Sequence, residues 1–545
     1  MRALPLVFLL LAFSPQDRRP NVLVIITDDQ GYGDLGCHGN PKIMTPNIDG
    51  FASESFQFER FCVNPVCSPT RAALLTGRYP YRTGIVDTFM GRSMMHADEV
   101  TLAERLGSAG YRTGIFGKWH LGDNYPLRAQ DQGFQECLTI RGGGIGQPSD
   151  PPGGDHYMDP TVYKNGKALK SSGYCTDVFT DAALEFMTES KDRPFFAYVP
   201  YNAPHTPLEV PDGYLRTYLD AGVPYGTAQV YAMVSNIDYN VGRLLGKLDQ
   251  LRIARDTIVI FMSDNGPERD RYNAGLRGLK GTVYEGGIRV PFFLRWPQLK
   301  EEPRKVAGLA TVLDIVPTIL DAAKVADHIK VPIDGMSLLP SLSTGKVADR
   351  SYFTQWHRGD VPEAFQACAA MDSRWKLVWT KPKVKPELFD FTKEEPEKDD
   401  VSAENPEVVE RLTKAYKDWF DDVKKNRDFA PPRILLGTEH EDPAVLTRQD
   451  LRNPKAGTIG TGHWLVELPA PVTFDVTVRF KAPGAPCKLT YVCGETKAEV
   501  DVAADATSVT LRKIAHAAGK AELGATIAAP KPYGPDYVEL KRSSP

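Results

Sequence analysis

The sequence lacks the features that mark membrane, repeat and nucleic-acid-binding proteins. After the first 20 residues, no apolar run approaches the length of a transmembrane helix. There is no internal repeat and no low-complexity tract. The 65 Lys and Arg residues nearly balance the 69 Asp and Glu residues, and no long run carries one sign. We therefore expect neither membrane insertion nor non-specific nucleic-acid binding.

Cysteine is also scarce, with eight residues in a chain of 545. Their spacing includes no C-x-x-C metal pattern and no short disulfide framework. The chain has no N-x-[ST] sequon either. For an exported protein, that absence favours a bacterial source over a glycosylated eukaryotic one.

The N-terminal stretch "MRALPLVFLLLAFSPQDRRP" has one early Arg, an apolar run and then polar residues. This order predicts a secretory signal peptide over residues 1–19, because the apolar run is too short to span a membrane. A disordered N-terminus is the alternative, since no tidy small-residue cleavage site is visible. We expect an exported protein, periplasmic or extracellular, in a compartment that permits disulfides.

At this length the chain is expected to hold two or three domains. Between residues 20 and 330, apolar runs alternate with amphipathic helical patterns such as those at 101–110 and 228–251. Four runs are continuous and rich in β-branched and aromatic residues, as buried parallel strands are: 21–27, 111–116, 194–199 and 257–262. The pattern predicts an α/β domain with a central, mostly parallel sheet flanked by helices.

The pattern changes twice after residue 330. Residues 331–430 combine the strand-like "RWKLVWT" with the amphipathic helix "NPEVVERLTKAYKDWFDDVKK", which predicts a smaller α+β subdomain. From residue 431 to 545 helices nearly vanish, and short alternating runs follow one another at hairpin spacing. This last part predicts an all-β sandwich.

The stretch "PVCSPTRAALLTGR" (65–78) places a cysteine at the start of a helix. Helix-start rules put the N-cap at Ser68, the first helical position at Pro69 and the C-cap at Gly77. Cys67 then stands at the positive end of the helix dipole, with Arg71 one turn further on. Such a site is suited to an anion.

Acidic and amide side chains follow two of the predicted strands. Asp28 and Asp29 come after 21–27, and Asp264 and Asn265 come just after 257–262. Ligands of open α/β sheets gather at the carboxyl ends of the strands. Oxygen donors of this kind suit a hard cation such as Ca²⁺ or Mg²⁺ better than zinc. A turn or helix cap is the plainer interpretation of an Asp-Asp pair.

Basic and titratable side chains follow the other two strands and a Gly-rich stretch. Lys118 and His120 come after 111–116, His205 comes after 194–199, and Lys280 lies in "RGLKGTVYEGG". Each of them alone is explained by a solvated loop. Their convergence at one sheet edge favours a catalytic site.

These motifs together resemble those of the formylglycine-dependent (type I) sulfatases of the alkaline phosphatase superfamily, with an arylsulfatase-like pattern. The motifs occur in the same order: "TDDQGYGDLG", "CSPTR" followed by "LLTGR", "GKWHLG", "APHTP", "SDNG" and "LKGTVYEGGIRVP". C-x-P-x-R alone is a weak signal, whereas six ordered motifs over about 21–430 are specific.

The resemblance implies a site built on a modified Cys67. A separate formylglycine-generating enzyme, acting on the unfolded chain, would oxidise Cys67 to formylglycine, whose hydrated aldehyde is the nucleophile. It also implies one Ca²⁺ ion held through Asp28, Asp29, Asp264 and Asn265, with the residue at 67 alongside. The remaining catalytic side chains implied are Arg71, Lys118, His120, His205 and Lys280. His205, with Lys280, would protonate the leaving alcohol, and His120 would take a proton from the nucleophile.

The substrate is predicted less directly. A long Gly/Pro-rich loop follows His120 and contains His156, and the stretch "QWHRG" supplies Trp356, His357 and Arg358. Trp356 and Arg358 suit a sugar face and an anionic neighbour, although surface positions or simple packing explain these residues equally well. Similar exported bacterial sulfatases with an added β-sandwich mostly act on polysaccharides. We therefore expect a sulfated glycan as the substrate.

Two other functions stay open at this point. The first is a phosphonate or phosphate monoester hydrolase of the same superfamily. The second is an exported glycan-binding protein with an inactive catalytic domain. The C-terminal sandwich itself is either structural or a carbohydrate-binding module, whose stacking side chains would be His463, Trp464, Tyr533 and Tyr537.

Overall fold

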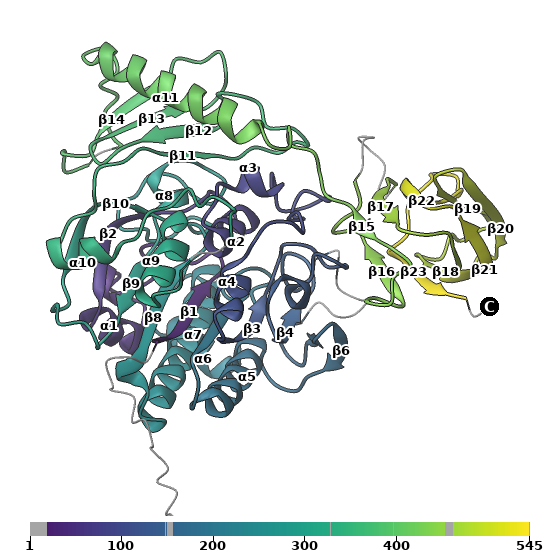
Figure 1. Cartoon of the computed structure of the whole chain (residues 1–545), viewed down its shortest axis with the longest axis horizontal. Helices are drawn as coiled ribbons and strands as arrows, with labels where there is room; N and C mark the ends of the chain where they lie inside the picture. Colours follow the sequence, from purple (N-terminus) through teal and green to yellow (C-terminus); the bar gives the residue numbers. More distant parts are fainter. Residues whose placement is uncertain are drawn as a thin grey trace, which may run out of the picture.

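A ten-stranded sheet forms the middle of the largest part of the chain (Figure 1). The computed structural model describes residues 19–147, 149, 156–326, 329–395, 397–452 and 461–543. The sheet order is β10-β2-β9-β8-β1-β7-β3-β4-β5-β6. Its strands are β1 (Asn21–Thr27), β2 (Phe56–Cys62), β3 (Arg112–Lys118), β4 (Glu136–Ile140), β5 (Thr161–Lys164), β6 (Lys167–Lys170), β7 (Phe195–Pro200), β8 (Thr257–Ser263), β9 (Phe292–Arg295) and β10 (Lys305–Thr311).

The five strands in the middle of this order, β8-β1-β7-β3-β4, pair in parallel. Strand β9 pairs antiparallel with both of its neighbours, and the β5–β6 hairpin adds an antiparallel edge. The predicted central parallel sheet is therefore confirmed, with antiparallel strands toward its edges. All four strands expected from continuous apolar runs are present within two residues of their expected ends.

Helices cover both faces of the sheet because the central strands are buried on both sides. Val22 and Val24 of β1 face one core together with α2, α4 and α9, while Leu23 faces another core with α1, α5 and α7. The helices of this part are α1 (Pro46–Ser53), α2 (Cys67–Thr76), α3 (Pro80–Thr83), α4 (Leu102–Ser108), α5 (Cys175–Ser190), α6 (Asp212–Asp220), α7 (Tyr225–Gln250), α8 (Glu285–Ile288), α9 (Ile315–Ala322) and α10 (Leu339–Thr344). Short 3-10 turns occur at η2 (Gly36–His38), η3 (Ala129–Gln132), η4 (Ala254–Asp256) and η5 (Val312–Asp314).

A smaller antiparallel sheet lies above the first in Figure 1, with one long helix on it. Its strands are β11 (Tyr352–Gln355), β12 (Cys368–Met371), β13 (Trp375–Trp379) and β14 (Glu387–Asp390), and the helix is α11 (Pro406–Lys424). Tyr416 and Trp419 of α11 pack in the same hydrophobic core as the strands. The predicted α+β character of this region is confirmed.

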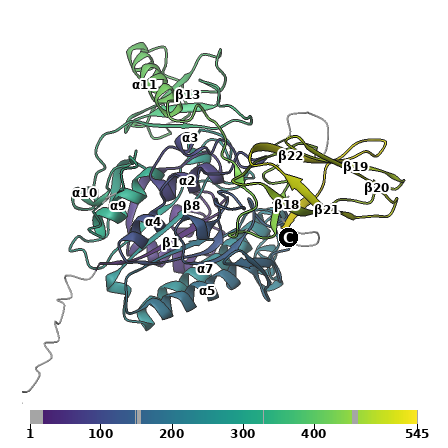
Figure 2. The same cartoon turned by 45° about the vertical axis from the view of Figure 1, so that its right-hand side comes forward.

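Two antiparallel-rich sheets at the C-terminal end form a sandwich, which lies at one side of the main body in both views (Figures 1 and 2). The first sheet has the order β15-β17-β22-β19-β20 and the second β16-β23-β18-β21. The strands are β15 (Ile434–Leu435), β16 (Ala444–Thr447), β17 (Trp464–Leu468), β18 (Val472–Arg479), β19 (Cys487–Cys493), β20 (Thr496–Val502), β21 (Ser508–His516), β22 (Gly519–Ile527) and β23 (Tyr537–Arg542). The sandwich core also takes in Met94 and Leu127 from the main body.

The sequence raises three questions that bear on export: a signal peptide, a membrane-spanning helix and disulfide bonds. The predicted signal peptide lies outside the described residues except for Arg19. Within the described ranges, no helix combines the length and apolarity needed to cross a bilayer. All eight cysteines are described, and none of them forms a disulfide bond.

Candidate active site

The carboxyl ends of four neighbouring strands, β8, β1, β7 and β3, bring the predicted site residues together. Asp28 and Asp29 follow β1, and Asp264 follows β8. Lys118 ends β3, and His205 lies five residues after the end of β7. The parallel pairing of these strands therefore explains why residues up to 236 positions apart meet.

Cys67 is the first residue of α2, with Val66 at the N-cap. The expected N-cap at Ser68 is wrong, because the Ser68 hydroxyl donates to the carbonyl of His120 at 3.1 Å and does not cap the helix. The expected C-cap is confirmed, since Gly77 has a φ of +68°. Cys67 is 3% exposed, and as the first residue of α2 it belongs to the turn whose N–H groups have no partner within the helix.

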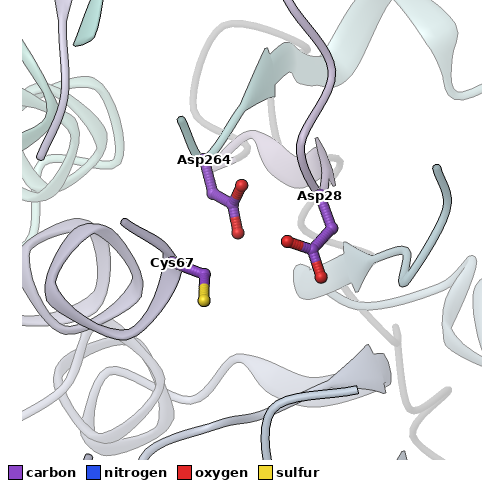
Figure 3. A group of neighbouring side chains, drawn as sticks. All are labelled: Asp28, Cys67 and Asp264. Atoms are coloured by element: carbon purple, nitrogen blue, oxygen red, sulfur yellow. The ribbon is translucent and has the colours of Figure 1, made fainter. Parts of the chain in front are cut away.

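Cys67 at the start of α2 lies beside Asp264 after β8 and Asp28 after β1 (Figure 3). One ligand-capable atom of each of these three residues lies within 4.8 Å of the other two. A second group of this kind joins Asp28 with Asp29 and His205. Both groups contain Asp28, so they outline one site.

Two cations inside the protein pair with the innermost carboxylates. Lys118 Nζ donates to Asp28 Oδ2 at 2.5 Å, and both side chains are fully buried. Arg71 donates to Asp264 Oδ2 through Nε at 3.1 Å and through Nη2 at 2.7 Å. Arg71 also donates to the carbonyl of Lys118 at 3.1 Å, which fixes the guanidinium under the helix start.

Asp29 contacts the side chains of Lys280, Asn265 and His205, which together form the outer half of the site. Lys280 Nζ lies 2.7 Å from its carboxylate, and the amide of Asn265 donates to Asp29 Oδ1 at 2.8 Å. His205 Nε2 is 3.8 Å from Asp29 Oδ2. The other ring nitrogen of His205 donates to the carbonyl of Thr206 at 2.6 Å, so Nε2 is the atom that faces the site.

Burial and close charges shift the pKa values in this cluster. Burial first and Asp28 second raise the pKa of Asp264 to about 6, against the opposing charge of Arg71. Burial also raises the pKa of Asp29, but Lys280 and His205 outweigh it and hold that pKa well below its usual range. Burial raises the pKa of the Cys67 thiol, so an unmodified thiol here is a poor nucleophile at neutral pH.

The donor set fits a hard divalent cation. Asp28 Oδ1 and Asn265 Oδ1 are buried and have no hydrogen-bond partner among the described residues. Burying such oxygens without a partner costs free energy that a bound cation would offset. The set consists of carboxylate and amide oxygens, which suits Ca²⁺ or Mg²⁺.

His120 has one ring nitrogen engaged in a hydrogen bond. Its Nε2 donates to the carbonyl of Thr88 at 2.8 Å. Its Nδ1 is buried and has no hydrogen-bond partner in the described part of the chain. Burial first and Lys118 second lower the pKa of His120 well below its usual value, so the ring is neutral with its lone pair on Nδ1.

Glycines of the loop after β4 lie against both histidines, a feature that sequence reasoning missed. A Cβ atom placed on Gly143 would be 2.8 Å from His120 Nε2, and one on Gly144 would be 3.6 Å from His205 Nδ1. The run "GGGIG" was visible as Gly-rich, but only the fold shows which side chains it approaches. The absence of a side chain at Gly143 and Gly144 leaves room for the two imidazole rings.

Of the four predicted substrate contacts, two lie near the site through hydrogen bonds to Asp87. Trp356 Nε1 donates to Asp87 Oδ1 at 2.9 Å, and Arg358 Nη1 donates to the same atom at 3.1 Å. Asp87 adjoins Thr88, the partner of His120, and a Cβ on Gly281 would lie 2.9 Å from the Trp356 ring. The Arg358 side chain is 63% exposed.

The other two predicted substrate contacts, His357 and His156, each contact a glutamate that is not one of the catalytic residues. His357 packs within its own loop, where Nε2 accepts from the main-chain N–H of Glu363 at 2.9 Å. His156 is 66% exposed and lies 3.8 Å from Glu209. Its neighbour Tyr157 is buried, and the Tyr157 hydroxyl donates to the carbonyl of His205 at 2.8 Å.

The aromatic side chains of the sandwich do not form one exposed platform. Trp464 is fully buried and donates to the carbonyl of Thr447 at 2.7 Å. Tyr533 and Tyr537 are half-buried, and Tyr537 has Arg479 over its ring at 6.0 Å. A stacking role for Trp464 is therefore wrong, because its ring belongs to the core.

Comparison with known proteins gives a consistent result. The family profile described as "Sulfatase" matches residues 20–325, and the profile described as "N-sulphoglucosamine sulphohydrolase, C-terminal" matches residues 279–425. N-acetylgalactosamine-6-sulfatase of Canis lupus familiaris is 35% identical over 369 residues, which is 63% of this chain and 69% of that protein. Arylsulfatase A of Homo sapiens is 32% identical over 497 residues, covering 78% of this chain and 92% of that protein.

A solved structure extends the similarity to the three-dimensional fold. The crystal structure of Ps i-CgsB in complex with k-i-k-neocarrahexaose superposes with a TM-score of 0.67 at 29% identity. The superposition covers 74% of this chain and 93% of that one.

Proposed function

This chain belongs to the sulfatase family and is a sulfuric ester hydrolase, and from this premise we propose that it removes sulfate from a sulfated polysaccharide or oligosaccharide. The observation that carries the proposal is the convergence of Cys67 with three carboxylates and several cationic groups at one sheet edge. Two relatives support a carbohydrate substrate: one is named for N-acetylgalactosamine 6-sulfate, and another was solved with a neocarrahexaose bound.

The charge of the site suits a sulfate monoester. Without a metal ion, the carboxylates of Asp28, Asp29 and Asp264 are balanced by the three cations Arg71, Lys118 and Lys280. A divalent cation would therefore make the site net positive and attract an anionic substrate. Asp28, Asp29, Asp264 and Asn265 would hold Ca²⁺, which supplies charge neutralisation for the sulfate group.

We propose that formylglycine at position 67 supplies the nucleophilic oxygen, because the thiol itself is buried and has a raised pKa. The helix N-terminus of α2 stabilises negative charge at this position. A side chain that is 3% exposed is out of reach for a modifying enzyme. This burial supports oxidation of Cys67 on the unfolded chain, before the site closes, by a formylglycine-generating enzyme.

The chain's own residues position the sulfate and move protons. Lys118 and Lys280 place their ammonium groups on two sides of the carboxylate cluster, where they stabilise charge that develops on the sulfate oxygens. His205 Nε2 faces the outer half of the site, and its imidazolium form, with Lys280, is the proposed acid for the departing alcohol. Burial lowers the pKa of His205 to about 4, against the opposing charge of Asp29, so a bound sulfate anion beside the ring would be needed to favour the imidazolium that carries a proton on Nε2. His120 accepts a proton through Nδ1, the ring nitrogen that has no other partner within the described residues.

Two alternatives are less well supported. A phosphate monoester carries close to two negative charges at neutral pH, and phosphatases of this fold typically use two metal ions. The candidate ligand groups found among the described residues share Asp28 and outline one metal position. An inactive glycan-binding protein is disfavoured because Lys118, His120, His205 and Lys280 all converge on the site.

Sulfate release from a panel of defined sulfated mono- and oligosaccharides tests the proposed function. The chain is produced together with a formylglycine-generating enzyme, and Cys67→Ala serves as the matched control. We expect free sulfate, measured by ion chromatography, from at least one saccharide and none with Cys67→Ala. Binding of sulfated saccharides without release by the modified chain would contradict the proposal and favour the glycan-binding alternative.

Mass spectrometry tests the proposed nucleophile directly. Trypsin should release the peptide "FCVNPVCSPTR" (61–71), which carries both Cys62 and Cys67. We expect an aldehyde at Cys67 and an unmodified thiol at Cys62. A fully active preparation with an intact thiol at Cys67 would rule out the formylglycine mechanism.

A further inference from the structure

A segment of the C-terminal sandwich enters the main body beside the active site. Residues 448–452 follow β16, and their main chain pairs with the loop that carries Gly91. The N–H of Gly91 donates to the carbonyl of Gln449 at 2.9 Å, and Arg452 Nη1 donates to the carbonyl of Gly91 at 2.9 Å. Leu451 shares a hydrophobic core with Met94. The segment is therefore anchored to the main body at Gln449 itself and at the residues that follow it.

Gln449 is buried, with 2% of the residue exposed, and its side-chain amide reaches the surroundings of His120. Its Nε2 donates to the carbonyl of Thr88 at 2.9 Å and to Ser93 Oγ at 3.1 Å. The same nitrogen is 3.4 Å from His120 Nε2. Gly142 closes the other side, since a Cβ placed on it would be 3.4 Å from Gln449 Cγ.

The Thr88 carbonyl is the acceptor that Gln449 and His120 share. It receives the Nε2–H of His120 at 2.8 Å and the amide N–H of Gln449 at 2.9 Å. A carbonyl oxygen has two lone pairs, so both bonds form at once. The amide thereby fixes the carbonyl that selects the His120 tautomer with its proton on Nε2.

We propose that Gln449 is a positioning residue for His120, so that the C-terminal sandwich completes the active site of the main body. The inference rests on the proposed function, in which His120 Nδ1 accepts a proton. Gln449 acts through Thr88 and through the space that it fills beside the ring. Without it, the imidazole gains room to turn and Nδ1 leaves its working position. A shift of about 1 Å in the position of a catalytic group can lower the rate by about 100-fold.

Gln449→Met tests the proposal because it keeps the length of the side chain and removes the N–H donors. We expect kcat for sulfate release to fall by about 10-fold or more, whereas KM changes by less than about 2-fold, because the amide does not touch the substrate. The matched control is Arg452→Met, which removes a bond to the same loop without touching His120. We expect Arg452→Met to keep the kcat of the unaltered chain.

Gln449→Glu supplies a second measurement, the pH dependence of kcat, which a purely structural role of Gln449 would not change. The groups that act on His120 are the cations Lys118 and Arg71 and the imidazole of His205, which all lower its pKa together with burial. A carboxylate at 449 would oppose them and stabilise the imidazolium. We expect the acidic limb of the kcat profile to move to higher pH in Gln449→Glu, whereas Gln449→Met leaves that limb closer to its original position.

The outcomes separate the proposal from the proposed function. An unchanged kcat in Gln449→Met overturns the proposal. The proposal is also overturned if Arg452→Met loses as much kcat as Gln449→Met while the two variants have the same thermal midpoint. If the unaltered chain releases no sulfate, the proposed function fails on its own. The tautomer of His120, read by ¹⁵N NMR of histidine-labelled protein, still tests the positioning role. We then expect Nε2–H in the unaltered chain and a mixture of tautomers in Gln449→Met, and identical spectra would overturn the proposal.

Discussion

Asp264 is the residue at which the opposing charges of the site meet. It accepts two hydrogen bonds from Arg71, yet burial and Asp28 still raise its pKa to about 6. One internal guanidinium therefore does not fully compensate the buried carboxylates. A divalent cation held by Asp28 and Asp264 would favour the ionised form of Asp264 and lower its pKa.

Asp264→Asn should weaken binding of a single Ca²⁺ ion, because it removes one charge from the ligand set and keeps the shape of the side chain. We expect the affinity to fall by at least about 100-fold, the upper end for loss of an outer-shell partner. Calorimetric titration of Ca²⁺ into the metal-depleted chain measures the effect. Asp314→Asn is the control, since Asp314 is equally buried and pairs with Arg350 away from the site. Unchanged Ca²⁺ affinity in Asp264→Asn, or zinc in the native protein, would contradict the assignment.

For single residues, the sequence predicts those that stand in motifs and misses those that are far from the motifs along the chain. Asp28, Lys118 and His205 could be predicted because each lies within a few residues of the carboxyl end of a strand-like run. Gln449 could not, because it lies more than 300 positions from His120 and belongs to the sandwich. An isolated Gln carries no pattern from which a role can be inferred.

The glycine-rich loop after β4 shows how an element shapes the site without supplying a functional group. Gly143 approaches His120 and Gly144 approaches His205. A loop with side chains at these positions would occupy the space of the imidazole rings. The loop therefore limits where both rings can lie.

Gly143→Ala should lower kcat, because its Cβ would lie 2.8 Å from His120 Nε2 and the ring would have to move. We expect a loss of about 10- to 100-fold in steady-state sulfate release, with a small change in thermal midpoint. Gly213→Ala in α6 is the control, since a Cβ there meets nothing within 4 Å. Full activity in Gly143→Ala would show that the loop is free to move away from His120.

The elements themselves were predictable where burial is uniform. Strands β1, β7 and β8 are buried along their whole length, so their apolar runs are continuous and easily recognised. The start of α2 differed from expectation because Ser68 donates to His120, a contact that local helix-start rules ignore. Strand β15 is two residues long and too short to give a pattern.

In the whole molecule, the sandwich is joined to the main body through buried carboxyl groups as well as apolar side chains. Burial first and Asp123 second raise the pKa of Asp450 well above its usual range, although Arg141 opposes the shift. Burial likewise raises the pKa of Asp123. Asp450 is 2% exposed and lies next to Gln449, so its protonation state affects the same junction.

The stability of this junction should fall as pH rises. A carboxyl group whose pKa is raised in the folded chain stabilises the fold below its unfolded pKa of about 4, and that contribution is lost as pH rises through the folded value. The amide side chain of Asp450→Asn cannot ionise, so the thermal midpoint of this variant should rise relative to that of the unaltered chain as pH increases above the unfolded pKa of about 4. Differential scanning calorimetry measures this difference. Asp505→Asn, on the exposed surface of the sandwich, is the control, and parallel curves for Asp450→Asn and the unaltered chain would contradict the prediction.

The central claim is that the site is built for a sulfate ester, and the preference for sulfate over phosphate tests it most directly. The measurement is kcat/KM of the fully modified chain for the sulfate and the phosphate ester of the same alcohol. One metal position with Arg71, Lys118 and Lys280 suits a monoanion and leaves a dianion incompletely neutralised. We predict that kcat/KM for the sulfate ester is higher by orders of magnitude. Equal values, or a preference for phosphate, would contradict the account and favour a phosphohydrolase.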